Sequence, residues 1–192
     1  MKKFLTLVVL LIAALCFRSV PVNADPLMNY NYFDLAYEYI SYDDSVIDDS
    51  NGFNSQLSYA IIDNLALEAG YDYLNSGDID GQLFSYGGAY WHSVEPGLDL
   101  VARVGGLHAR VESDIADVSD NGIYAGGEVR YLLTKVYELD GSITYAHIND
   151  TTWTVATSLL RTISDNLALR GGVGITDDSD VVLQAGIRLA FN

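Results

Sequence analysis

The chain has 192 residues, of which 10 are basic and 26 are acidic, and its formal net charge is −16. Nucleic acid is a polyanion that proteins bind through basic patches, so this charge excludes a nucleic-acid-binding protein. After residue 24 no segment has 18 consecutive apolar residues, which excludes a transmembrane helix in that part of the chain.

The first 24 residues have the layout of a secretory signal peptide. Lys2 and Lys3 form a positive start, residues 4–17 are apolar, and Val22 and Ala24 occupy positions −3 and −1 of a cleavage after Ala24. A retained anchor is the alternative, but spanning a bilayer takes about 20 apolar residues. We expect residues 1–24 to be removed, which leaves one domain, residues 25–192, with 7 basic and 26 acidic side chains.

The rest of the chain alternates between apolar and polar residues with a period of two, which is typical of β-strands that have two different faces. Helical spacing is absent. The pattern predicts ten strands, at 29–41, 53–62, 65–74, 82–92, 97–111, 122–133, 136–148, 152–163, 166–175 and 180–191. Most have about the length that a tilted strand needs to cross the hydrocarbon layer of a membrane.

The connections between these strands alternate between long and tight. Residues 42–52, 75–81 and 112–121 form long, acidic connections, whereas Asp63-Asn64 and Thr134-Lys135 form tight turns. Asp and Asn suit such turns because they tolerate positive φ. Long loops at one end and tight turns at the other are typical of a barrel in an outer membrane.

The two faces of the strands differ in chemistry. One face carries large apolar side chains on nearly every strand, such as Leu65, Leu67 and Tyr71, while the other carries Gly, Ala, Ser and charged residues. The polar set is too small and too charged to form a dry core, and an apolar band of this size would be a very large patch in water. We therefore expect the apolar face to contact lipid and the polar face to line a lumen.

These patterns predict an all-β protein, a transmembrane antiparallel up-and-down β-barrel of ten strands. Eight strands are the alternative, should weak segments such as 152–163 fail to cross the membrane. The faces of strand 82–92 are ambiguous, because Phe84, Tyr86 and Tyr90 favour one parity and Leu83 and Trp91 the other. A soluble β-sandwich or a lipocalin-like binder is the remaining alternative.

The C-terminal strand carries a predicted signal for the barrel-assembly machinery, formed by Gln184, Gly186, Leu189 and Phe191. Together with residues 29–39 and the Asp-Asn-Leu-Ala-Leu turns at 63–67 and 165–169, this ending resembles the small outer-membrane β-barrel (porin-like, outer-membrane-protein-A-like) family of Gram-negative bacteria. Asn192 departs from the pattern, because the aromatic residue is usually the last. The resemblance implies the fold and the outer membrane as location, with export through the periplasm, whereas members of the family have many different activities.

Charged residues of the polar face form the candidate functional site. An arginine in a narrow lumen needs carboxylate partners, because an unpaired buried charge is costly. We predict an ion-pair network that fills the lumen, and a narrow cation-preferring ion path is the alternative. The predicted members are Asp34, Glu38, Glu68, Asp72, Asp99, Arg103, Glu128, Arg130, Glu138, Asp140, Arg170 and Arg188.

Other chemistry is less well supported by the sequence. No cofactor motif or metal-ligand spacing is present, so no cofactor or metal site is expected, although the acidic loops are possible contacts for divalent cations. A lipid-modifying enzyme would need a nucleophile beside a histidine. His92 lies at the wrong end, and neither His108 nor His147 has a neighbouring serine, so we expect no enzyme.

The functional hypothesis is therefore an outer-membrane barrel with a structural and surface-contact role. A narrow channel is the first alternative and a lipid-modifying enzyme the second. Expected partners are outer-membrane lipid and lipopolysaccharide, the barrel-assembly machinery and periplasmic chaperones.

Overall fold

The computed structural model describes residues 28–43, 48–113 and 117–191. The predicted signal peptide, residues 1–24, lies outside the described residues, so its removal stays a prediction. Within the described residues, no helix is long and apolar enough to cross a membrane.

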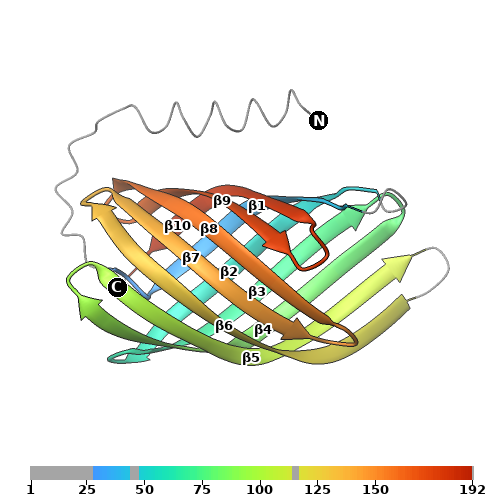
Figure 1. Ribbon diagram of the computed structural model, residues 1–192, viewed down its shortest axis with the longest axis horizontal. Coiled ribbons are helices and arrows are strands. Elements are labelled where there is room, and N and C mark those ends of the chain that lie inside the picture. The colour runs from blue at the N-terminus through green and yellow to red at the C-terminus, as the bar shows by residue number, and fades with distance from the viewer. Residues whose placement is uncertain (1–27, 44–47, 114–116, 192) are drawn as a thin grey trace.

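The described residues form a closed barrel of ten antiparallel strands, in which each strand pairs with its neighbours in sequence and β1 pairs with β10 (Figure 1). The predicted all-β, ten-stranded fold is thus confirmed, and the eight-stranded alternative is wrong. The strands are β1 (Tyr32–Ser41), β2 (Ser50–Ile62), β3 (Leu65–Ser76), β4 (Ile79–Glu95), β5 (Leu98–Ser113), β6 (Asp117–Thr134), β7 (Tyr137–His147), β8 (Thr151–Ser164), β9 (Leu167–Thr176) and β10 (Val181–Ala190).

The two ends of the barrel differ in their connections. At one end, called the turn end below, two residues join β2 to β3, β4 to β5, β6 to β7 and β8 to β9. Asn64 in the first of these turns has a φ of 69°, and Gly97 in the second has a φ of 85°. Asn and Gly tolerate this left-handed backbone better than other residues do, which explains why they stand there. The opposite end is called the loop end.

Several strands continue further at the loop end than the sequence pattern predicts. Residues 75–81 and 112–121 were expected to be loops, but β3 and β4 are joined by only Gly77 and Asp78, and β6 already begins at Asp117. Ile79 and Val118 lie in these extensions, and β-branched residues favour extended backbone. Beyond the membrane a strand needs no apolar face, so acidic residues do not end it.

The barrel places its large apolar side chains on the outside. Leu67, Val104 and Val155 are each more than half exposed, whereas Ala66 and Ala89 on the inner face are fully buried. Because no soluble barrel could leave this band in water, the outer face is suited to contact lipid.

Strand β4 resolves the ambiguity that the sequence left open. Phe84, Tyr86 and Tyr90 are exposed on the outer face, while Trp91 packs inside. On the inner side of β4, Gly87 and Ala89 precede Trp91, so small residues make room for its large ring.

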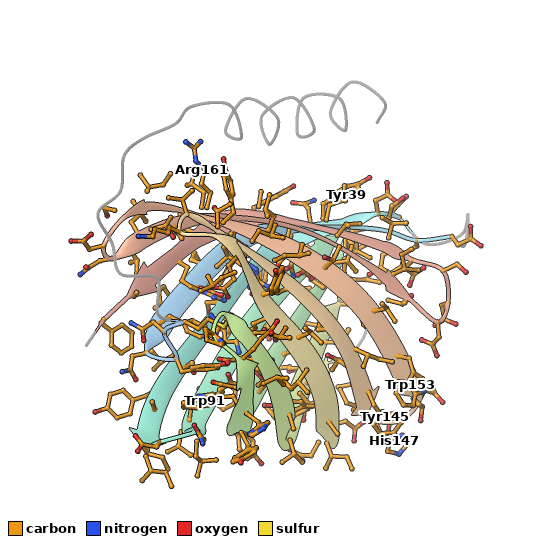
Figure 2. The ribbon with its side chains drawn as sticks, turned by 60° about the vertical axis from the view of Figure 1, so that its left-hand side comes forward. Tyr39, Trp91, Tyr145, His147, Trp153 and Arg161 are labelled. Carbon is orange, nitrogen blue, oxygen red and sulfur yellow. The ribbon has the colours of Figure 1, made fainter. Side chains whose placement is uncertain are left out.

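Aromatic side chains also mark the outer surface at the loop end. Tyr145 of β7 and Trp153 of β8 meet edge to face with ring centroids 5.0 Å apart, and both point away from the barrel beside His147 (Figure 2). Arg161 lies towards the other end of β8, 5.9 Å from the centroid of the Tyr137 ring on the outer face. Aromatic residues at both rims fit the interfaces of a membrane.

Inner-face glycines allow the strands and lumen side chains to approach closely. A Cβ atom on Gly105 would lie 2.1 Å from the Tyr86 carbonyl oxygen and 2.5 Å from the Tyr124 ring, whereas a Cβ on Gly141, which shares the outer face with Leu139 and Ile143, would meet nothing within 4 Å. We therefore expect Gly105→Ala to destabilise the barrel by about 1–3 kcal/mol through overpacking. Gly141→Ala, the matched control, should leave stability unchanged.

Urea unfolding of the protein in lipid vesicles measures both variants. Equal stability of Gly105→Ala and Gly141→Ala would contradict the tight packing around Gly105.

Candidate functional site

The charged residues of the inner face meet in the half of the lumen nearer the turn end. Asp34 of β1 is fully buried and lies at one end of this cluster. Arg188 of β10 donates two hydrogen bonds to it, from Nε to Oδ1 and from Nη2 to Oδ2, each 2.8 Å long. Arg170 of β9 donates a third, from Nη1 to Oδ2 at 3.0 Å. One carboxylate thus holds two guanidinium groups, and the pair with Arg188 is bidentate.

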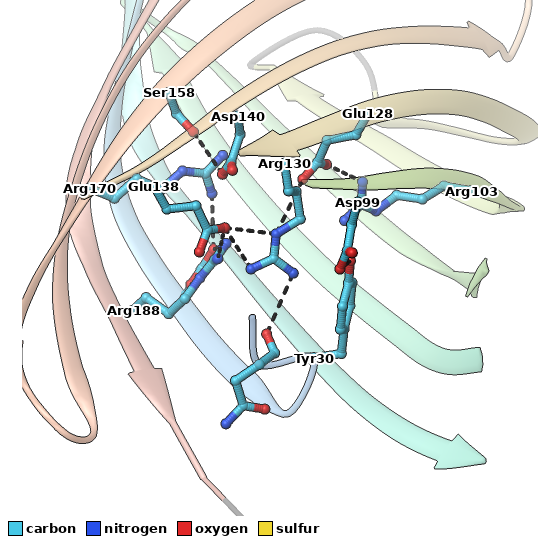
Figure 3. Close-up of polar contacts among 12 residues, drawn as sticks. Tyr30, Asp99, Arg103, Glu128, Arg130, Glu138, Asp140, Ser158, Arg170 and Arg188 are labelled. Atoms are coloured by element: carbon cyan, nitrogen blue, oxygen red, sulfur yellow. Dashed lines mark hydrogen bonds and ion pairs between the residues drawn. The ribbon is translucent and has the colours of Figure 1, made fainter. Parts of the chain in front are cut away.

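Arg130 of β6 forms the centre of the cluster and is only 1% exposed. Its Nε and Nη2 atoms lie 2.7 and 2.6 Å from Oε1 of Glu138 on β7 (Figure 3). Oε1 of Glu138 also lies 3.6 Å from Nη1 of Arg188. Glu138 therefore links Arg130 to the pair formed by Asp34 and Arg188.

A third group extends the cluster to the opposite wall. Arg103 of β5 donates from Nε to Glu68 of β3 at 3.0 Å, and it also forms an ion pair with Glu128 of β6. Glu128 in turn lies 4.0 Å from Arg130. The result is a continuous chain of ion pairs across the lumen, here called the lumen chain, which consists of Arg170, Asp34, Arg188, Glu138, Arg130, Glu128, Arg103 and Glu68.

Four predicted members have other partners. Asp99 accepts a hydrogen bond from the Tyr30 hydroxyl at 2.8 Å, and Asp140 accepts one from the Ser158 hydroxyl at 3.3 Å. Nearer the loop end, the partner of Glu38 is the Gln184 amide and that of Asp72 is the Asn54 amide. These four carboxylates make no ion pair with an arginine among the described residues, so the predicted network holds eight of its twelve predicted members in ion pairs.

Sequence reasoning missed the short segment that precedes β1. The sequence pattern predicts a first strand at 29–41, but β1 begins at Tyr32 and Tyr30 lies in the mouth of the lumen. The Tyr30 ring stacks on Trp91 with centroids 3.8 Å apart and planes within 8°, and the Arg130 guanidinium lies 4.5 Å from its centroid. Burial raises the pKa of the Tyr30 hydroxyl, so it stays protonated and donates to Asp99.

Residues on both sides of Tyr30 fasten the same segment. Asn29 donates its side-chain amide to the Phe191 carbonyl at 3.2 Å, and its own carbonyl accepts from Arg130 at 3.5 Å. The side-chain oxygen of Asn31 accepts from the Ala60 backbone at 2.7 Å. Residues 28–31 are here called the mouth segment. The sequence contained one indication, since Tyr30 and Tyr32 share the parity of inward-facing Asp34.

Two cavities remain beside the lumen chain. A cavity of about 460 Å³ opens at the turn end between Leu132, Leu160 and Arg188, and a smaller one of about 100 Å³ lies deeper, beside Asp140 and Arg170. Arg188 borders both, so its side chain separates them. Asp140 Oδ1, Arg170 Nε and Arg188 Nη1 are buried without hydrogen-bond partners, so the smaller cavity is suited to ordered water.

The four residues of the predicted assembly signal lie outside the lumen chain. In β10, Gln184 bonds Glu38, Gly186 packs against Ala36, and Leu189 is exposed on the outer face. Phe191 follows the strand and donates its backbone N–H to Asn31 at 3.0 Å. Whether the assembly machinery recognises these four positions stays a prediction.

The histidines considered for catalysis lie on the outer face. His108 contacts the Asn121 side chain at 3.0 Å, and His147 contacts the Thr151 hydroxyl at 3.1 Å. The sequence search considered only serine, so the hydroxyl of Thr151 is a partner that it missed. A nucleophile and base of this kind also need a third group that orients the base. No carboxylate contact to His147 is recorded in the part of the chain that the structure describes.

The acidic loops do not gather into a metal site within the described residues. Instead, several carboxylates bond nearby groups: Asp80 accepts from the Tyr73 hydroxyl at 2.7 Å, Asp180 from the Asp43 backbone at 3.1 Å, and Asp177 from the Trp153 backbone at 3.0 Å. Residues 44 and 114, two further acids of these loops, lie outside the described residues.

Comparison with known families identifies the family of the chain. Residues 7–178 match the family model of the outer membrane protein beta-barrel domain. Among solved structures, the chain is similar to the KdgM porin in complex with disordered oligogalacturonate, with 14% identity and a TM-score of 0.49 over 83% of this chain and 99% of that chain. No curated protein sequence matches the chain.

Two further solved structures are similar to the chain at comparable sequence identity. The N-terminal β-barrel domain of Pseudomonas aeruginosa OprF is 15% identical, with a TM-score of 0.48 over 85% of this chain and 100% of that chain. Ail, the attachment invasion locus protein of Yersinia pestis, is 16% identical, with a TM-score of 0.43 over 82% of this chain and 95% of that chain.

Proposed function

Because the chain belongs to the family of the outer membrane protein beta-barrel domain, we propose that it is an outer-membrane barrel with a closed lumen and a structural and surface-contact role. The observation that supports a closed lumen is the lumen chain, whose eight side chains come from seven of the ten strands. Buried charges that are paired in this way rigidify a lumen and leave little room for solutes.

In this proposal the turn end faces the periplasm and the loop end faces the outside of the cell, as is usual for barrels in this membrane. Export would depend on the signal peptide at residues 1–24, and insertion on the barrel-assembly machinery and periplasmic chaperones. Outer-membrane lipid and lipopolysaccharide would surround the apolar band.

A narrow cation-preferring channel is the second candidate. Glu38 and Asp72 favour it, because they are acidic inner-face residues of the loop-end half and their hydrogen bonds are made with amides. Such carboxylates would attract cations. This candidate nevertheless requires the lumen chain to open, and in particular the Arg188 side chain between the two cavities to move.

Catalysis has no part in the proposal. The nearest approach to catalytic chemistry is the contact between His147 and Thr151 on the outer face. A carboxylate partner for that histidine would be needed to support a lipid-modifying enzyme.

The experiment that tests the proposal uses cells that lack the protein, with two readouts. We expect the deletion to increase uptake of the hydrophobic dye N-phenylnaphthylamine, which reports a weakened outer membrane, and expression of the wild-type chain to restore the barrier. The same expression should not accelerate entry of a small hydrophilic antibiotic. Faster antibiotic entry would support the channel, and an unchanged dye barrier in the deletion strain would contradict the structural role.

A further inference from the structure

Strand β6 is the longest strand of the barrel, and at the loop end it extends further than its neighbour β7. Its pairing with β5 extends to Asp117, opposite Glu112, but its pairing with β7 begins only at Ile123, opposite His147. Residues 117–122 therefore have a strand partner on one side only, and they are here called the β6 edge. Figure 1 shows the β5–β6 hairpin reaching beyond the β7–β8 hairpin at this end.

The β6 edge offers backbone groups for pairing. In an antiparallel ladder every second residue directs its N–H and C=O towards the same neighbour, so about three of these six residues face the open side. Among the described residues, the β7–β8 side covers only the Gly122 end of the edge, where a Cβ atom would lie 2.6 Å from the Ile148 side chain, and it makes one hydrogen bond further along, from the Asn149 side chain to the Asp120 carboxylate at 2.7 Å. Open edges are templates for a further strand.

An apolar cavity of about 290 Å³ lies directly beside this edge. It lies between Val111 and Val118 on the hairpin and Ile148 on the β7–β8 connection, with Ala109 and Ala146 behind. Val111 and Val118 are about half exposed, although this part of the hairpin extends past the apolar band. A strand added to the β6 edge would direct alternate side chains to this face, where the cavity could receive one apolar side chain.

The negative charge around the β6 edge determines which kind of partner strand could bind there. Asp117 and Asp120 lie on the edge and Asp150 lines the cavity. The nearby Arg110 is already paired, at 2.7 Å with Asp117 and at 3.0 Å with Glu112. A second copy of this chain would bring the same carboxylates against each other, and like charges facing across a sheet are destabilising. A segment with lysine or arginine would instead complement the edge.

From this geometry we infer that the β6 edge binds an extended, basic segment of another protein by strand addition, with one apolar side chain of that segment in the cavity. This inference rests on the proposed surface-contact role and names the chemistry of the partner. Specific recognition would come from the charge and the cavity, and the backbone ladder would supply affinity.

The test uses the purified mature protein in detergent micelles and fluorescent peptides of eight residues that alternate lysine and valine. We expect saturable binding by fluorescence anisotropy, which weakens as salt screens the charges. The corresponding glutamate–valine peptide should not bind. A lysine–valine peptide with proline at its centre should bind at least tenfold more weakly, because proline removes a backbone donor.

Protein variants locate the binding site. Val118→Asp places a charge in the cavity and should weaken binding at least tenfold. Ile79→Asp is the matched control, since Ile79 is similarly exposed at the same end of the barrel but lies on β4, and it should leave binding unchanged. Heat-modifiable gel migration shows that both variants are folded.

Three results would overturn the inference: equal binding by the Val118→Asp variant, equal binding of the proline peptide, or a dimer of this chain that Val118→Asp abolishes. The Val118→Asp chain should still restore the dye barrier in cells. A wild-type chain that restores the barrier but does not bind the lysine–valine peptide would therefore remove only this inference. A wild-type chain that binds the peptide but fails to restore the barrier would contradict the proposed function and leave the peptide result standing.

Discussion

Replacing Asp34 with alanine is expected to destabilise the barrel by about 3–5 kcal/mol, the range found when one partner of a buried ion pair is removed. The substitution leaves Arg170 without its recorded carboxylate partner and Arg188 with only the longer contact of 3.6 Å to Glu138. Urea unfolding in lipid vesicles, followed by tryptophan fluorescence, measures the effect.

A double substitution separates the ion pair from general damage to the lumen. In Asp34→Ala with Arg188→Met, the guanidinium is removed together with its partner, so the combined loss should be smaller than the sum of the two single losses by about 1 kcal/mol or more. The exposed pair of Arg110 and Asp117 gives the control, because Asp117→Ala should cause no measurable change. Additive losses at Asp34 and Arg188 would contradict the importance of their pairing.

Replacing Tyr30 with alanine is expected to release the mouth segment and expose Trp91 to water. Truncating a packed aromatic side chain costs about 3–5 kcal/mol, and only a few hydrogen bonds of Asn29 and Asn31 would remain to hold the segment. The chain has two tryptophans, so the background Trp153→Phe leaves Trp91 as the single fluorophore. Iodide should then quench Trp91 weakly in the parent and strongly in Tyr30→Ala.

Tyr30→Phe is the matched control for this experiment. It keeps the ring on Trp91 and under Arg130 but loses the hydrogen bond to Asp99, which is worth about 1 kcal/mol. Quenching should therefore stay close to that of the parent. If Trp91 is equally protected in all three proteins, the mouth segment does not cover it.

The sequence predicts the barrel well because its physical cause is local. A strand with lipid on one side and a lumen on the other must alternate, as Leu65 and Leu67 do with Ala66 and Glu68, and this alternation is visible without any knowledge of neighbours. The ends of the strands are less predictable. Above the membrane both faces of Asp117–Gly122 meet water, so no alternation marks where β6 begins.

The partners in the lumen could not be predicted from the sequence because they depend on the closure of the barrel. Arg170 and Asp34 are 136 residues apart, and they meet across β10, which lies between their strands and presents the small Gly186 opposite Arg170. Trp91 posed a related difficulty, since its size suggested the lipid face. Inside the barrel it stacks on Tyr30, whose own segment looked like the start of a strand.

Planar-bilayer recording tests the closed lumen most directly. The wild-type protein, inserted from detergent into a lipid bilayer in 1 M KCl (about 3 Å Debye length, so that surface charge is screened), should produce no stable unitary conductance. Stable steps in the wild type, with an amplitude that changes in Arg103→Ala or Arg130→Ala, would contradict the closed lumen and support the cation-preferring channel.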